Sequence, residues 1–198
     1  LKQICDKYRL AMVEDAAQSL GSLYNGRHTG TSGLLSALSF NGNKIVTTGG
    51  GGAILTNDSK LAALAKHLTT TAKKPHPYEF FHDMAGYNSR MPNINAALGC
   101  AQMEKIESFI SRKRFLASRY AKELKGISWI RFLDEPTYAR SNYWLNTIIL
   151  DAENEGFRIN LIDGLRNAGF MVRPAWRLMH ELPMFGKFPK MDLSNAVS

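Results

Sequence analysis

The order of apolar and polar residues predicts several strands in the first third of the chain. Residues 10–14 form a short apolar run that ends in acid, which is typical of a buried parallel strand with a functional group at its carboxyl end. The pattern predicts further strands over residues 34–40, 45–48 and 53–56. A turn over residues 41–44 would separate two of them. Ligands of α/β proteins bind at such carboxyl ends.

Apolar residues at helical spacing predict helices around these strands. Residues 1–8 have helical composition, and Asn57-Asp58 forms an N-cap for a helix over residues 60–68. Residues 92–124 carry apolar side chains at a spacing that fits one long helix or two joined ones. Gly126 then breaks the pattern.

Beyond Gly126 the pattern changes character. Residues 129–132 and 143–150 predict strands, residues 158–168 predict a helix that Gly169 ends, and residues 170–172 predict another strand. This order suits a small α+β domain.

Two loops stand out between these elements. Residues 21–33 are rich in glycine and contain Asn25-Gly26, which predicts a loop or a short hairpin. The loop that reaches Arg90 contains several aromatic residues and is long for a connector, which favours a functional role.

Composition indicates a globular protein with one core and a smaller second unit. The 198 residues are 44% hydrophobic and 21% charged. No run of eighteen apolar residues occurs, and the first ten residues lack the layout of a signal peptide. We therefore expect a cytoplasmic protein without a membrane partner. The chain starts and stops within its pattern, so we expect it to be part of a longer protein.

The net charge of +8 raises the alternative of a nucleic-acid partner. The basic residues are spread along the chain, and the densest cluster, residues 112–114, lies in a helical pattern. We expect a solvated face there and no nucleic acid. A basic surface equally suits a substrate that carries a diphosphate.

Cysteine and histidine usage argues against metal and disulfide chemistry. Cys5 and Cys100 have no ligand-spaced partners, which predicts buried thiols. The five histidines are scattered, and we expect each to be a surface or core residue and no metal site. His76, between two prolines, is the best candidate among them for a substrate contact.

Four residues in one segment carry the candidate chemistry. Asp15 ends the first predicted strand with Gln18 just beyond, Ser39 lies near the end of the second, and Lys44 precedes Gly49 to Gly52. Alone, Asp15 is typical of a helix cap or turn, and Lys44 of a surface charge. Together they meet the needs of pyridoxal phosphate, which requires a lysine amine, a carboxylate for the pyridine nitrogen and donors for the phosphate.

Several strings in the expected order resemble the DegT-type sugar-nucleotide aminotransferases, a family of fold-type-I pyridoxal-phosphate enzymes. The strings lie at 13–21 (VEDAAQSLG), 39–45 (SFNGNKI), 49–54 (GGGGAI), 86–91 (GYNSRM), 93–97 (NINAA) and 143–146 (YWLN). The resemblance covers nearly the whole chain. Ser89 departs from it, because many relatives have an aromatic residue there.

The resemblance implies a fold and a domain division. The fold would be α/β, with an incomplete large domain built on a mixed, mainly parallel sheet and a smaller C-terminal α+β domain. Residues 1–90 would be the C-terminal half of the cofactor-binding domain, residues 91–125 the connecting helix, and residues 126–198 the truncated small domain. The family's N-terminal part, with further phosphate ligands and a ring-stacking aromatic, has no counterpart here, which implies that the isolated chain is inactive or nearly so.

It also implies residue roles. Lys44 would hold pyridoxal 5'-phosphate and act as general base and acid, Asp15 would pair with the pyridine nitrogen, and Gln18 would lie near the phenolic oxygen. Ser39 would bind the phosphate, and Asn88 would reach the cofactor of the neighbouring subunit in a homodimer with a shared active site.

On the substrate side, Arg27 and Arg173 are either surface cations or contacts to a diphosphate or a donor carboxylate. We expect the amino group of glutamate or glutamine to pass to a keto carbon, C4, of a nucleotide-linked deoxy sugar. Residues 75–80 and 173–179 look closest to members that make 4-amino sugars for nonulosonic acids or related surface glycans. Trp144 and Trp176 are expected to pack in the core or at an interface.

Two alternatives stay open at this point. The first is a related dehydratase that removes a sugar hydroxyl, but those enzymes replace the lysine with histidine, so Lys44 argues against it. The second is a non-catalytic regulator or binding module with the same fold. Discharge of the bound cofactor by an amino donor would separate them from an aminotransferase.

Overall fold

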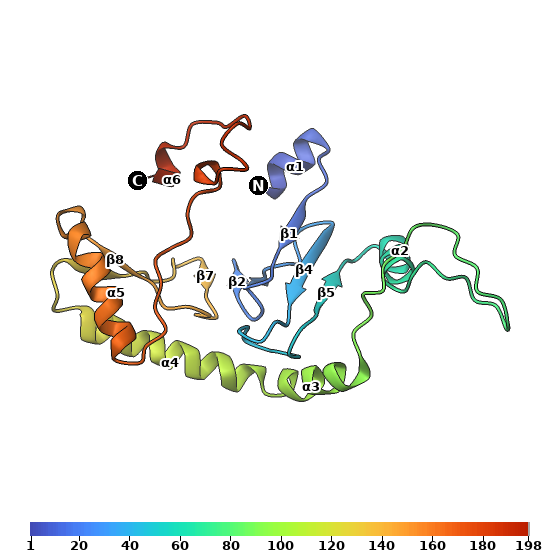
Figure 1. The fold of residues 1–198 in the computed structure, drawn as a ribbon, viewed down its shortest axis with the longest axis horizontal. Coiled ribbons are helices and arrows are strands. Elements are labelled where there is room, and N and C mark those ends of the chain that lie inside the picture. Colours follow the sequence, from blue (N-terminus) through green and yellow to red (C-terminus); the bar gives the residue numbers. More distant parts are fainter. Residues whose placement is uncertain (198) are drawn as a thin grey trace. The chain divides into compact units, whose positions relative to one another are not determined.

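The computed structural model describes residues 1–197 (Figure 1). Their contacts divide the chain into two compact units, one over residues 1–149 and one from residue 150 onward. The first unit contains all the predicted cofactor residues. Within the described residues, no helix is long and apolar enough to cross a membrane.

A mixed three-stranded sheet lies at the centre of the first unit, with strand order β1-β4-β5 (Figure 1). Strand β1 (Val13–Asp15) runs parallel to β4 (Leu35–Ser39), and Asp15 faces Ala37 in the register. Strand β5 (Gly52–Leu55) is antiparallel to β4. The predicted mixed sheet is confirmed, with one parallel and one antiparallel pairing among these strands.

The glycine-rich loop forms the hairpin that its turn signal predicts. Strands β2 (Leu23–Tyr24) and β3 (Arg27–His28) are antiparallel, and β7 (Ala139–Arg140) pairs with the other side of β2. Asn25 and Gly26 at the tip have φ angles of 48° and 76°. Asn and Gly tolerate this left-handed conformation, which a two-residue hairpin of this kind requires.

Helices flank the sheet as the apolar spacing predicts. Helix α1 spans Lys2–Tyr8 and α2 spans Ser59–Thr69. The carboxylate of Asp58 accepts the backbone N–H groups of Lys60 and Leu61 at 2.8 and 3.0 Å, so the predicted cap of α2 is confirmed. An irregular segment follows α2, and Figure 1 shows it projecting from the sheet before the chain returns.

The long helical pattern resolves into two joined helices, α3 (Asn93–Met103) and α4 (Ile106–Leu124). Helix α4 lies against β6 (Ile130–Phe132), which forms a two-stranded sheet with β8 (Ile148–Leu150). Ile110 of α4 is fully buried. A Cβ atom on Gly21 would lie 2.1 Å from its Cδ1 atom, so only glycine lets this loop approach the helix so closely.

Helices make up the regular structure described in the second unit beyond residue 150. It contains the 3-10 helix η1 (Ala152–Phe157), helix α5 (Arg158–Asn167), the short 3-10 helix η2 (Met179–Glu181) and helix α6 (Ser194–Val197). Gly169 follows α5 with a φ angle of 86°, the left-handed conformation in which glycine commonly ends a helix. The predicted helix and its stop are confirmed.

Three predicted strands are wrong in whole or in part. Residues 45–48 form no strand, because their backbone groups bond elsewhere, as described below. The strand predicted over residues 143–150 is limited to β8, since Tyr143 has a φ angle of 45° that a strand cannot contain. Residues 170–172 belong to no strand of the described chain.

The first predicted strand differs in burial. It was expected to be buried, but Val13 is 67% exposed. Strand β1 has only β4 as a neighbour within the described residues, so one of its edges has no partner strand there.

Candidate functional site

Asp15 and Ser39 lie at one edge of the central sheet. Each is the last residue of its strand, and the two strands are parallel neighbours, so their carboxyl ends meet at the same edge. The Asp15 carboxylate also accepts the N–H of Ala17 at 3.0 Å. The Ser39 hydroxyl accepts the N–H of Asn41 at 3.3 Å. Both side chains therefore shape the turns that follow them and keep further acceptor capacity.

Lys44 lies in the loop that leaves this edge. Its backbone N–H donates to the carbonyl of Asn41 at 3.0 Å, which closes the predicted turn. The loop then returns to the sheet, because the N–H of Thr48 and the hydroxyl of Thr47 both donate to the carbonyl of Phe40, at 2.9 and 3.1 Å. The Lys44 side chain is half-buried.

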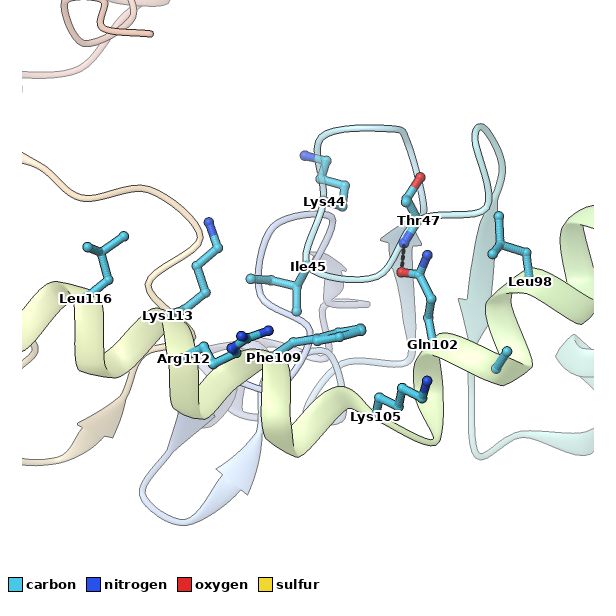
Figure 2. A pocket seen from close by; sticks show the side chains of 11 residues that line it. Lys44, Ile45, Thr47, Leu98, Gln102, Lys105, Phe109, Arg112, Lys113 and Leu116 are labelled. Carbon is cyan, nitrogen blue, oxygen red and sulfur yellow. Dashed lines mark hydrogen bonds between the residues drawn. The ribbon is translucent and has the colours of Figure 1, made fainter. Parts of the chain in front are cut away.

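Helix α3 anchors the far side of the Lys44 loop. The side-chain oxygen of Gln102 accepts the N–H of Thr47 at 3.0 Å, as the dashed line in Figure 2 shows. The amide of Asn95 donates to the carbonyl of Thr48 at 2.5 Å. These bonds replace the ladder that a strand over residues 45–48 would have made. Sequence spacing gave no sign of them, because Gln102 is 55 positions from its partner.

Trp144 contacts the other side of the loop. Its indole N–H donates to the carbonyl of Asn43 at 2.5 Å, and the amine of Lys44 lies 4.2 Å from the centroid of its ring. The expectation that Trp144 serves only in packing is therefore incomplete. Nothing in the sequence pattern relates Trp144 to a loop 101 positions away.

Asn142 links the same turn to Gln18. Its side-chain amide donates to the carbonyls of Gln18 and Leu20 at 2.9 and 3.0 Å, and its oxygen accepts the N–H of Trp144 at 2.9 Å. Asn142 is 3% exposed, so these bonds are shielded from water. One short segment thus connects the predicted residues Gln18 and Lys44.

A polar network around Asp134 and Glu135 stabilises the segment that contains Asn142 and Trp144. The hydroxyl of Tyr143 donates to the carboxylate of Asp134 at 2.8 Å, and burial together with that bond raises the pKa of Tyr143. The guanidinium of Arg114 pairs with the carboxylate of Glu135 at 2.6 and 2.7 Å. This pairing lowers the pKa of Glu135 and raises that of Arg114. Glu135 also accepts the N–H of Ser141.

Glu14 organises the loop at the start of β4. Its carboxylate accepts the N–H groups of Gly30, Ser32 and Gly33 at 2.8, 2.7 and 2.5 Å. Burial raises the pKa of Glu14, but the three N–H donors together outweigh it and hold the pKa below its ordinary value. Glu14 is thus a structural carboxylate beside Asp15.

A basic cleft of about 650 Å³ opens between the Lys44 loop and helices α3 and α4. Figure 2 shows Lys113 extending from α4 and Lys44 from the loop that faces the helix. Lys105, Arg112 and the ring of Phe109 line it as well. Anionic groups would be attracted to this combination of several cations and an apolar wall.

The other predicted residues lie elsewhere. Asn88 forms an isolated antiparallel bridge with Thr70 beside the end of α2, and no hydrogen bond within residues 1–197 joins it to the residues above. His76 accepts the N–H of Glu79 at 2.9 Å and packs edge-on against Tyr78. Arg27 is exposed on β3. Arg173, in the second unit, lies over the ring of Trp176 at 4.7 Å.

The donor set fits pyridoxal phosphate and does not fit a metal. A carboxylate and a hydroxyl end neighbouring parallel strands at one sheet edge, and the loop that leaves this edge carries a lysine. These are the kinds of group that the pyridine nitrogen, the phosphate and the aldehyde of the cofactor require. Within residues 1–197, no three His, Cys, Asp or Glu side chains lie close enough to hold a metal ion.

The fold of the chain is that of the fold-type-I pyridoxal-phosphate enzymes. More particularly, the chain belongs to the DegT/DnrJ/EryC1/StrS aminotransferase family, whose model matches residues 1–197. Pyridoxal phosphate is the cofactor of this family. The expected family and fold class are confirmed.

Relatives and solved structures agree with this assignment. GDP-perosamine synthase of Vibrio cholerae is 36% identical over 205 residues, covering 100% of this chain and 54% of that enzyme. Helicobacter pylori PseC, an aminotransferase involved in the biosynthesis of pseudoaminic acid, shares the fold with a TM-score of 0.92 at 24% identity, over 99% of this chain and 53% of that one. DesI, solved in the presence of its TDP-sugar product, has a TM-score of 0.86 at 26% identity, over 98% and 49%. The chain spans about half the length of the curated relatives it matches.

Proposed function

We propose that this chain carries the lysine-bearing half of an aminotransferase site that acts on a nucleotide-linked keto sugar. The amino group would come from glutamate or glutamine and would pass to C4 of a deoxy sugar destined for a surface glycan. The observation that carries the proposal is the Lys44 loop, which leaves the sheet edge where Asp15 and Ser39 end parallel strands in a family of sugar aminotransferases.

Each residue has a role that its position supports. Asp15 would accept a hydrogen bond from the protonated pyridine nitrogen, and its negative charge would keep the proton there. When bound, pyridoxal phosphate supplies an electron sink for the electrons left at the donor's Cα atom. The amine of Lys44 would take the proton from that atom and return it to the neighbouring carbon. Ser39 would donate its hydroxyl to the phosphate, and Gln18 would lie near the phenolic oxygen.

The substrate residues are proposed on chemistry alone. Arg27 or Arg173 would pair with a diphosphate or with the carboxylate of the donor, and His76 would contact the sugar. Asn88 would reach the cofactor of a second subunit, which makes the active enzyme a homodimer. The proposed division into residues 1–90, 91–125 and 126–198 follows the same family pattern, and we place the enzyme in the cytoplasm.

A 4-amino product for a nonulosonic acid or a related surface glycan is the substrate class we favour. The named relatives that support it are a GDP-perosamine synthase and an aminotransferase of pseudoaminic acid biosynthesis. The dehydratase alternative is weaker because the loop carries Lys44, whose amine can bind the cofactor covalently. A non-catalytic module would bind the cofactor without turnover.

The experiment that tests the proposal uses the protein expressed from its complete reading frame. Pyridoxal phosphate is added, the complex is reduced with borohydride, and the modified peptide is located by mass spectrometry. We expect the label on Lys44, no label in Lys44→Ala, and full labelling in Lys60→Ala, a control at an exposed lysine of α2. Glutamate should discharge the unreduced complex of the wild type. Labelling of another lysine, or none, would overturn the assignment of Lys44.

A further inference from the structure

Trp144 holds the peptide group directly before Lys44. The carbonyl of Asn43 belongs to that peptide group and accepts the indole N–H at 2.5 Å. The N–H of the same peptide, on Lys44, donates to the carbonyl of Asn41 at 3.0 Å. Because both polar groups of the peptide are bonded, its plane is restrained, and the position of the Lys44 Cα atom, from which the side chain starts, is restrained with it.

Trp144 also contacts the other end of the same side chain. The amine of Lys44 lies 4.2 Å from the centroid of the indole ring, within the range of a cation–π interaction. The ring face attracts an ammonium ion but offers no carboxylate that would hold it as an ion pair. Trp144 therefore contacts both the peptide group that precedes Lys44, through the Asn43 carbonyl, and the reactive amine of Lys44.

The position of Trp144 is itself fixed. Its N–H donates to the side chain of the buried residue Asn142 at 2.9 Å, and its carbonyl accepts the amine of Lys113 at 3.3 Å. Tyr143, between them, is 8% exposed and holds a left-handed backbone conformation. A residue held by its neighbours in this way can position another, whereas a mobile surface tryptophan could not.

We propose that Trp144 is a positioning residue for Lys44, and that its ring face is the resting place of the Lys44 amine whenever that amine is not bonded to the cofactor. This inference rests on the proposed function. A lysine side chain has four rotatable bonds, and an unrestrained amine would spend little time near the reacting carbon. The indole confines the amine without neutralising it, so Lys44 leaves and returns over a short path.

Two variants separate the two contacts. Trp144→Phe keeps an aromatic face and removes the N–H donor, and Trp144→Leu removes both. Tyr8→Leu is the matched control, because it removes an aromatic ring 5.2 Å from the amine of Lys7 on the exposed helix α1. Circular dichroism of each variant shows whether it folds, and the milder Phe variant keeps the test usable if the Leu variant does not.

The first measurement needs no cofactor. Lysine labelled with ¹³C at Cε is incorporated into the complete protein, and the Lys44 signal is assigned with Lys44→Arg. The ring current of Trp144 should shift the Lys44 Cε protons upfield of the protons of lysines that face no aromatic ring. Lys73, which lies 3.7 Å from the ring centroid of Phe80, should be shifted as well and should keep its shift in all Trp144 variants. We expect the Lys44 shift to disappear in Trp144→Leu, to be reduced in Trp144→Phe, and to stay in Tyr8→Leu. An unshifted Lys44 signal in the wild type would overturn the resting place.

The second measurement follows the rate at which Lys44 captures pyridoxal phosphate, by stopped-flow absorbance. Once the amine is no longer held near the reacting carbon, capture should slow about fivefold to fiftyfold in Trp144→Leu. The amount of cofactor bound at saturation should stay unchanged, since Asp15 and Ser39 are not altered. An unchanged capture rate would refute positioning. Absence of capture by the wild type would refute the proposed function instead, while the cofactor-free measurement would still test the contact.

Discussion

The side-chain amide of Asn142 donates to the carbonyl of Gln18, 124 positions earlier in the chain, at 2.9 Å. The same amide donates to the carbonyl of Leu20. A single buried side chain thus joins the segment beyond α4 to the turn that follows the first strand of the sheet. The stability of that turn depends on a residue that the local sequence does not include.

Replacement of Asn142 by leucine should destabilise the protein strongly. The change leaves two backbone carbonyls and the N–H of Trp144 without their partners, and each buried polar group left unpaired costs about 1–3 kcal/mol. We expect a loss of at least about 3 kcal/mol, measured by urea denaturation. Asn41→Leu, at an exposed position, should change stability by less than about 1 kcal/mol. Equal losses for the two variants would contradict the role of Asn142.

Protonation of Glu135 should weaken the network under Tyr143. The hydrogen bond from the guanidinium of Arg114 holds the pKa of Glu135 below its ordinary value in the folded protein. The stabilisation is therefore fully present above the unfolded pKa and is lost as the pH falls through the lower folded pKa. Glu135→Gln should cost about 1–2 kcal/mol at pH 7, and the difference from the wild type should shrink as the pH drops below about 4.

Melting temperatures of both proteins between pH 3 and 7 check this expectation. Glu107→Gln is a suitable control, because Glu107 is 78% exposed and its oxygen lies 3.8 Å from Arg140. A Glu135 difference that does not vary with pH would mean that the carboxylate charge has no part in the network.

Gly52 should not tolerate alanine, whereas Gly50 should. A Cβ atom on Gly52 would lie 2.4 Å from the carbonyl oxygen of Leu38, across the pairing of β4 and β5. A Cβ atom on Gly50 would meet nothing within 4 Å. We expect Gly52→Ala to cost about 2–4 kcal/mol by strand displacement, and Gly50→Ala to be nearly neutral. Comparable thermal shifts for the two variants would show that the sheet can adjust at Gly52.

Gln102→Leu should loosen one amide of the Lys44 loop and spare its neighbour. The N–H of Thr47 bonds to the Gln102 side chain, whereas the N–H of Thr48 bonds to the carbonyl of Phe40. Hydrogen exchange of the Thr47 amide should accelerate about threefold to tenfold, by the net worth of one hydrogen bond. Thr48 serves as the control within the same molecule, and equal acceleration of both amides would mean that the whole loop had opened.

Sequence reasoning predicted the elements whose signals are local. The Asn25-Gly26 hairpin, the Asp58 cap and the stop at Gly169 each depend on residues within a few positions. The strand predicted over residues 45–48 failed because Gln102 and Phe40 take its hydrogen-bonding groups. The roles of Asn142 and Trp144 could not be predicted from the local sequence, because their hydrogen-bond partners lie more than a hundred positions away. The sequence did allow three candidate cofactor residues to be chosen, namely Asp15, Ser39 and Lys44. They have the chemical groups that pyridoxal phosphate requires, and they lie at or just after the ends of predicted strands.

The alternation of Asn142, Tyr143 and Trp144 has a consequence for engineering. The outer two side chains serve partners at opposite ends of the candidate site, and Tyr143 between them has a φ angle of 45°. Deletion or insertion of one residue here would exchange the directions of the three side chains and misdirect both connections at once. Chimeras that graft a foreign C-terminal segment onto this sheet should therefore place their junction outside residues 141–144. The hydrogen bonds from Asn142 to Gln18 and from Trp144 to the Lys44 loop would then be kept.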